Sequence, residues 1–102
     1  MIPYGRQDIS EADIAQVVEV LRSDFLTQGP VVPRFEAALA ARSGTAHGVA
    51  FSSATAALHG ACHALGLGPG DRLWTVPNSF VASANCARYL GAEVDFVDIE
   101  LE

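Results

Sequence analysis

The sequence predicts an α/β fold in which helices cover a mainly parallel sheet. After residue 47, short apolar runs alternate with Ala-rich runs of helical period, in the order strand, helix, strand, helix, strand. The links between them are short and contain Gly and Pro, and this alternation is typical of parallel sheets. Residues 1–46 read instead as an arm and two helices. We therefore expect one incomplete domain, divided into residues 1–46 and 47–102.

Composition narrows the class of protein. The 102 residues allow one small domain, and 50% of them are apolar, which argues against disorder. The net charge of −6 makes nucleic acid and anionic membrane surfaces poor partners. No secretory signal and no apolar run long enough to span a bilayer is seen. Cys62 and Cys86 have no disulfide framework around them, which predicts buried thiols in the cytoplasm.

The first part of the chain shows ordinary helix signals. An extended arm, residues 1–9, displays Tyr4, for which packing on the protein itself is the simplest interpretation. Ser10 begins a helix, and Asp13 stands three residues later, as in a capping box. A polar turn closed by Gly-Pro leads to a second helix over residues 32–42.

The second part carries the alternating pattern. Residues 47–51 read as a buried strand, and a helix follows from Ser53 to about Leu65. A second strand is predicted over residues 72–76, a helix over 81–90 and a third strand over 93–99. Because the chain stops just after that last strand, we expect it to be the front part of a longer protein.

Two connections in this pattern could carry a site. Ser52-Ser53-Ala54-Thr55 lies where a strand meets a helix N-terminus, whose unpaired N–H groups and partial positive charge suit a phosphate. Simple capping of the helix by a serine explains the same residues. Pro77-Asn78-Ser79-Phe80 follows the next strand, and ligands of such sheets bind at the carboxyl ends of strands. A phosphate cradle and an aromatic at one edge together favour a flat, phosphorylated cofactor.

A metal site is not expected. His59 and His63 stand one turn apart beside Cys62, but a further ligand is not apparent, so the histidines are interpreted as ordinary helix residues. All six basic residues are arginines, so the chain contains no lysine.

Several runs in order carry a resemblance that spans essentially the whole chain. The chain resembles the N-terminal quarter of the sugar aminotransferases of the DegT/DnrJ/EryC1/StrS family, which are fold-type I enzymes that use pyridoxal phosphate (PLP). The runs that carry the resemblance are Pro3-Tyr4-Gly5-Arg6-Gln7, Leu26-Thr27-Gln28-Gly29-Pro30, Ser53-Ala54-Thr55-Ala56-Ala57-Leu58-His59, Gly66-Leu67-Gly68-Pro69-Gly70-Asp71, Ser79-Phe80-Val81-Ala82-Ser83-Ala84-Asn85 and Val94-Asp95-Phe96-Val97-Asp98-Ile99.

The resemblance implies roles for individual residues. Thr55 and Ala56 would hold the cofactor phosphate, and Phe80 would stack on the pyridine ring, within the N-terminal part of the fold-type I large domain. Phe25 falls where the family varies. The lysine that binds the cofactor covalently, and the aspartate that pairs with the pyridine nitrogen, match no residue of this chain, so we expect the isolated chain to be inactive. The positions matching nucleotide-sugar contacts are Tyr4, Asp24, Phe25, Leu26, Thr27 and Ala54.

Within the family, the Leu-Thr-Gln-Gly and Ser-Phe-Val-Ala-Ser-Ala-Asn runs point to the pseudaminic-acid branch. Members of that branch transfer an amino group from glutamate to the C4 keto group of a UDP-linked 4-keto-6-deoxy-N-acetylhexosamine. The resemblance also implies a homodimer in the full-length form. Two other hypotheses stay open: a non-catalytic α/β module that binds a phosphate or a nucleotide, and an inactive remnant.

Overall fold

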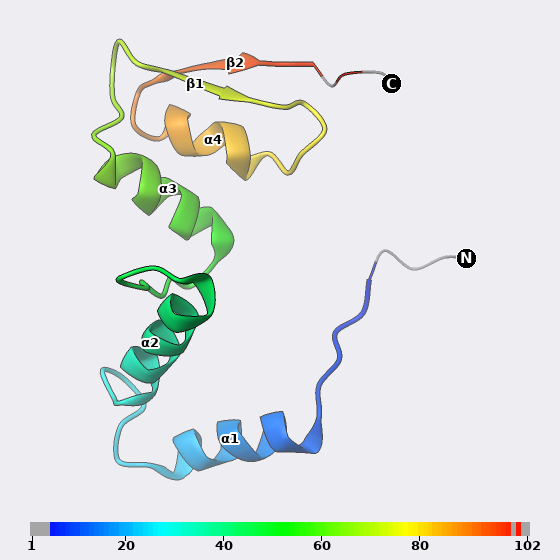
Figure 1. Ribbon diagram of the computed structural model, residues 1–102, viewed down its shortest axis with the longest axis vertical. Helices are drawn as coiled ribbons and strands as arrows, with labels where there is room; N and C mark the ends of the chain where they lie inside the picture. Colours follow the sequence, from blue (N-terminus) through cyan, green and yellow to red (C-terminus); the bar gives the residue numbers. More distant parts are fainter. Residues whose placement is uncertain (1–4, 99, 101–102) are drawn as a thin grey trace. The chain divides into compact units, whose positions relative to one another are not determined.

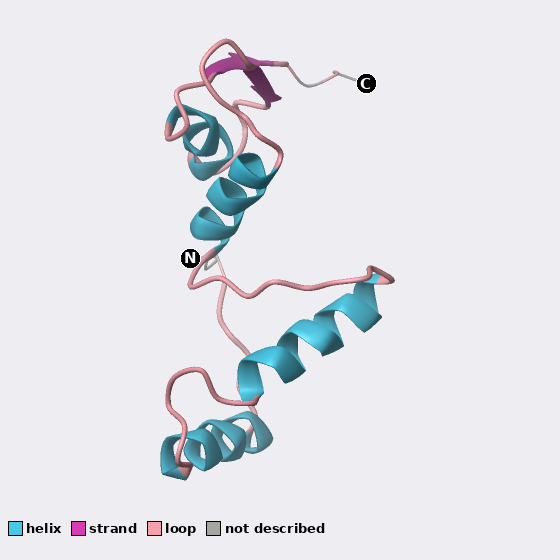
Figure 2. Ribbon diagram, turned by 90° about the vertical axis from the view of Figure 1, so that its left-hand side faces the viewer, coloured by secondary structure: helices cyan, strands magenta, loops and turns pink. Residues whose placement is uncertain are grey.

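The computed structural model describes residues 5–98 and 100, and confirms the α/β class (Figures 1 and 2). Tyr4 and Ile99 lie outside the described residues. The chain divides into two compact units, Met1–Val49 and Ala50–Glu102, and each is described by itself. The elements are α1 (Glu11–Arg22), α2 (Val31–Ser43), α3 (Ala54–Ala64), β1 (Arg72–Thr75), α4 (Ala82–Arg88) and β2 (Glu93–Phe96).

The first helix begins as its sequence predicts. Ser10 is the N-cap of α1 and forms a complete capping box with Asp13. The Ser10 hydroxyl accepts the Asp13 N–H at 3.3 Å, and the Asp13 carboxylate accepts the Ser10 N–H at 2.8 Å. The hydrogen bonds that Ser10 donates from its backbone and its hydroxyl lower the pKa of Asp13.

The second helix ends on a glycine, because the chain there turns into the left-handed region. Gly44 has φ 66°, and its N–H reaches back to the carbonyls of the last turn of α2. Apart from Ala40, which is buried, the apolar stripe of α2 is exposed, and so is most of that of α1, where Val18 and Val20 are half-buried. The apolar side chains exposed on these two helices include Ile14, Val17, Leu21, Phe35 and Leu39.

The second unit is a parallel βαβ arrangement to which α3 adds a further helix. β1 and β2 pair in parallel, with Arg72 opposite Glu93 and Thr75 opposite Phe96. The connecting helix α4 packs on both strands and on α3 (Figure 1). Small buried residues let these elements approach closely. The buried residues of this unit are Cys62, Ala82, Cys86, Ala87 and Ala92.

One guanidinium spans the strand pair. Arg72 on β1 pairs with Glu93 at 2.6 Å and with Asp95 at 3.0 Å, both on β2. The hydrogen bond to Glu93 and the charge of Asp95 raise the pKa of Arg72. All three side chains are largely exposed, so these pairs contribute little to the stability of the fold.

The predicted strand over residues 47–51 is wrong. These residues are not assigned to a strand, and Val49 and Phe51 keep 66% and 48% of their surface exposed. A strand needs a neighbouring strand for its ladder, and the described two-stranded sheet contains only β1 and β2. The apolar run therefore has the residue pattern of a strand but lacks a neighbouring strand with which to pair. The other predicted elements are present with ends shifted by a few residues.

Candidate functional site

The first wall of the candidate site is the N-terminus of α3. Ser53 is the N-cap: its hydroxyl accepts the Ala56 N–H at 3.1 Å, and its carbonyl accepts the Ala57 N–H at 3.0 Å. Capping by Ser53 is thus real, but it satisfies only part of the helix end. Within residues 5–98 and 100, the N–H groups of Ala54 and Thr55 and the Thr55 hydroxyl have no hydrogen-bond partner. These three donors remain available to an anion.

The second wall is the connection between β1 and α4. Phe80 stands just before α4, and its carbonyl accepts both the Ser83 N–H at 3.0 Å and the Ser83 hydroxyl at 2.9 Å. These two hydrogen bonds tie the backbone of Phe80 to the first turn of the helix. The Phe80 side chain keeps 73% of its surface exposed, so its ring is available to a flat partner.

The two walls enclose one hollow of about 230 Å³. The hollow brings Thr55 and Phe80 together, although they come from different connections, because α3 packs on α4. Ser79 and Ser83 also line it, and sequence reasoning assigned no role to either. Both stand in the Ser-Phe-Val-Ala-Ser-Ala-Asn run, which was the available signal. The full lining is Ala54, Thr55, Leu58, Ser79, Phe80, Ala82 and Ser83.

Ala56 is placed differently from Thr55. Its N–H is already bonded to Ser53, and it lines a separate hollow with His59, Gly60 and His63. The ring of Phe51 lies against Gly60, where an added Cβ would come 2.6 Å from the ring. Of the two residues predicted to hold a phosphate, Thr55 alone lines the hollow that Phe80 shares.

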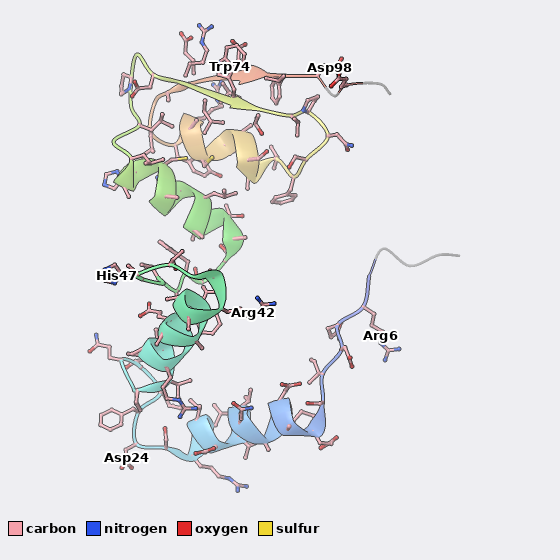
Figure 3. The ribbon with its side chains drawn as sticks, in the orientation of Figure 1. Arg6, Asp24, Arg42, His47, Trp74 and Asp98 are labelled. Atoms are coloured by element: carbon pink, nitrogen blue, oxygen red, sulfur yellow. The ribbon has the colours of Figure 1, made fainter. Side chains whose placement is uncertain are left out.

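The predicted substrate residues of the first unit lie on the turn between α1 and α2. Asp24 is exposed at the end of α1 (Figure 3). Leu26 and Thr27 are also exposed, and so is Phe25, which lines a hollow of about 160 Å³ together with residues of both helices. That hollow is lined by Gln16, Glu19, Val20, Ser23, Phe25, Pro30, Val31 and Arg34.

The two cysteines and His59 take part in packing. Cys62 on α3 and Cys86 on α4 are free, buried and close to one another. Burial raises the pKa of Cys62, and the neighbouring Cys86 thiol adds to the effect, so Cys62 stays a neutral thiol. His59 meets Tyr89 edge to face, with ring centroids 5.2 Å apart. Among the residues described, no group of three or more His, Cys, Asp or Glu side chains could hold a metal ion.

No helix in the described part of the chain has the length and apolar character needed to cross a membrane. Trp74 lies on the face of the β1–β2 pair that points away from α4, and it is 67% exposed (Figure 3).

The chain is similar over almost its whole length to parts of longer known proteins. It is 39% identical over 101 residues to the UDP-4-amino-4-deoxy-L-arabinose–oxoglutarate aminotransferase of Shewanella sediminis, covering 99% of this chain and 26% of that protein. It is 42% identical over 99 residues to the spore coat polysaccharide biosynthesis protein SpsC of Bacillus subtilis, covering 97% of this chain and 25% of that protein.

The chain is also similar to parts of solved aminotransferase structures. A candidate sugar aminotransferase of Streptococcus pneumoniae, Spr1654, in its PLP form, superposes with a TM-score of 0.90 at 37% identity, over 97% of this chain and 25% of that one. An aminotransferase of Psychrobacter cryohalolentis gives a TM-score of 0.88 at 27% identity, over 96% of this chain and 26% of that one. The chain thus spans about a quarter of the length of the proteins it matches.

A family profile matches residues 7–102, almost the entire chain. The chain therefore belongs to the DegT/DnrJ/EryC1/StrS aminotransferase family.

Proposed function

We propose that the protein carrying this chain is a PLP-dependent aminotransferase of nucleotide-linked sugars, and that this chain supplies the cradle for the cofactor. One observation carries the proposal: the free donors of Thr55 and the exposed ring of Phe80 line the same hollow. Membership of the family and the PLP form of the Streptococcus pneumoniae relative support it.

The residues present fit the phosphate of such a cofactor. The N–H groups of Ala54 and Thr55 and the Thr55 hydroxyl are three unpaired donors at the positive end of α3. Ala56 adds a fourth donor if its N–H exchanges the Ser53 hydroxyl for a phosphate oxygen, since that N–H is bonded to Ser53 here. Ser53 keeps the helix start in place, because its carbonyl also holds Ala57.

Phe80 fits the flat part of the cofactor. A ring stacked against a planar group fixes the orientation of that group, and the hydrogen bond from the Ser83 hydroxyl to the Phe80 carbonyl fixes the backbone that carries the ring. When bound, PLP supplies an electron sink that permits the exchange of an amino group between two carbon skeletons. The role of this chain is to bind and orient it.

The amine that attaches the cofactor and carries the proton is not supplied here, because the chain has no lysine. The proposal therefore assigns that amine to residues outside this sequence. Binding by this chain and chemistry by the rest are separate contributions.

The substrate proposal is a UDP-linked sugar with a keto group at C4, with glutamate as the amino donor. Its support is the Shewanella relative, whose name gives both a UDP-4-amino sugar and oxoglutarate. The finer proposal is the 4-keto-6-deoxy-N-acetylhexosamine of the pseudaminic-acid branch, which rests on the sequence runs alone. Ala54 and the turn residues Asp24, Phe25, Leu26 and Thr27 would meet this substrate, as would Tyr4, and the full-length form would be a homodimer.

A pair of measurements tests the proposal. The full-length protein, mixed with PLP, glutamate and a UDP-linked 4-keto-6-deoxy-N-acetylhexosamine, should form the 4-amino sugar, whereas purified residues 1–102 should not. Turnover by the isolated chain would contradict the assignment of the amine elsewhere. PLP binding by the full-length protein without turnover on any UDP-4-keto sugar would favour a binding module over an enzyme.

A further inference from the structure

The turn between α1 and α2 is organised around Ser23. The Ser23 N–H closes α1 on the Val20 carbonyl at 3.0 Å, and the Ser23 hydroxyl donates to the same carbonyl at 2.7 Å. That hydroxyl also accepts the Phe25 N–H at 3.3 Å, and the Phe25 carbonyl lies 3.2 Å away as an alternative acceptor. One side chain therefore ties the end of the helix to the backbone of Phe25.

Gly29 holds the other side of the same backbone. A Cβ added at Gly29 would stand 2.7 Å from the Phe25 Cβ and 3.1 Å from its carbonyl oxygen. Neither of those atoms is the far end of a flexible side chain, so the clash cannot be relieved by a simple rotation. Gln28 has φ 56°, the left-handed conformation that a non-glycine residue rarely adopts, and it turns the chain so that Gly29 returns to Phe25. Phe25 is thus held between Ser23 and Gly29.

We propose that Gly29 and Ser23 are positioning residues for the loop Asp24–Thr27, and that they fix the shape in which this loop meets the nucleotide-sugar. The inference rests on the proposed function, which assigns that loop to the substrate. Neither residue needs to touch the substrate, because each acts through the backbone of Phe25. The cofactor cradle at Thr55 and Phe80 belongs to another part of the chain and should be unaffected.

A matched pair of glycine variants separates positioning from general loss of structure. In Gly29→Ala the new Cβ meets Phe25, whereas in Gly68→Ala it meets nothing within 4 Å, and neither glycine has a positive φ. Two dissociation constants are measured on the full-length protein: that of PLP by absorbance and that of UDP-linked 4-keto-6-deoxy-N-acetylhexosamine by titration calorimetry.

We expect Gly29→Ala to weaken sugar binding by about tenfold or more, since a displaced loop loses its aligned contacts. Its affinity for PLP, and both affinities of Gly68→Ala, should stay within about twofold of wild type. Sugar binding by Gly29→Ala within about twofold of wild type would overturn the inference and leave the proposed function standing. An equal loss of both ligands would indicate that Gly29→Ala unfolds, and the serine variants described next then decide the inference.

The serine supplies a second, gentler test should Gly29→Ala fail to fold. Ser23→Ala removes the hydroxyl and should weaken sugar binding, whereas Ser23→Thr keeps it and should restore binding, with PLP affinity unchanged in both. Equal sugar affinities for the Ala and Thr variants would refute the role of Ser23. A wild-type protein that binds no UDP-sugar would instead refute the proposed function, and the inference with it.

Discussion

Replacing Thr55 by Val tests the phosphate cradle directly. Val has nearly the shape of Thr, so the change removes a hydroxyl donor and leaves the backbone N–H of residue 55 in place. Three unpaired donors stand at this helix end, two from Thr55 and one from Ala54, and both residues line the hollow. Losing one of the three should weaken cofactor binding without abolishing it.

The expected loss follows from the strength of one hydrogen bond to a charged group. It is about 1–3 kcal/mol, which corresponds to a PLP dissociation constant raised about 5- to 150-fold. The helix itself should be little affected, because Ser53, not Thr55, caps it, and Thr and Val have similar helix propensities.

The assay is a PLP titration of the full-length protein followed by cofactor absorbance, with thermal unfolding of the cofactor-free protein as the check on folding. Thr55→Ser is the matched control, since it keeps the hydroxyl, and it should bind within about twofold of wild type. Ser53→Ala is the opposite control, because it should lower stability by about 0.5–2 kcal/mol through loss of the cap. An unchanged dissociation constant for Thr55→Val, with a folded protein, would remove the Thr55 hydroxyl from the site.

Three further experiments have defined outcomes. In the full-length protein, Phe80→Ala should weaken PLP binding and lower turnover while Phe80→Trp is tolerated; equal behaviour of the two would make Phe80 a packing residue. In purified residues 1–102, the amides of residues 47–51 should exchange quickly with solvent, and cooperative protection there in a monomer would contradict the absence of a strand. The pKa of Asp13 is lowered by folding, so its capping box supports α1 above the unfolded pKa of about 3.9 and is lost as pH falls through the folded value. Acid should therefore reduce helicity less in Asp13→Asn than in wild type.

Local signals were predictable from the sequence because they involve residues that are close along the chain. The capping box needs only Ser10 and Asp13, and the end of α2 needs only Gly44. The adjacent, parallel strands β1 and β2 also follow, since a short helical connection returns the chain to the neighbouring position. The prediction of a strand over residues 47–51 failed, because strand formation depends on a neighbouring strand that the hydrophobicity of the segment cannot reveal.

The candidate site was predictable in part for the same reason. Thr55 and Phe80 each follow from a motif, and their meeting follows from packing between α3 and α4. The sequence did not predict whether the Ser53 hydroxyl or an anion would take the Ala56 N–H, because the same residues allow a capped helix end and an open one. The contact between Gly29 and Phe25 was hidden for another reason: Gln28 gives no warning of a left-handed conformation.

The arrangement of the site suggests why binding and chemistry can be divided along the chain. The donors of Thr55 sit at a helix N-terminus. The positive potential of a helix N-terminus comes from the peptide groups of that helix, so it does not depend on which strands complete the sheet beside it. The backbone of Phe80 is likewise tied locally, by a hydrogen bond from Ser83 one turn later. An amine that must reach the bound cofactor has no such local support, since its position depends on the fold as a whole. Changes at Thr55 or Phe80 should therefore act first on cofactor affinity, and changes in turnover should follow from that loss.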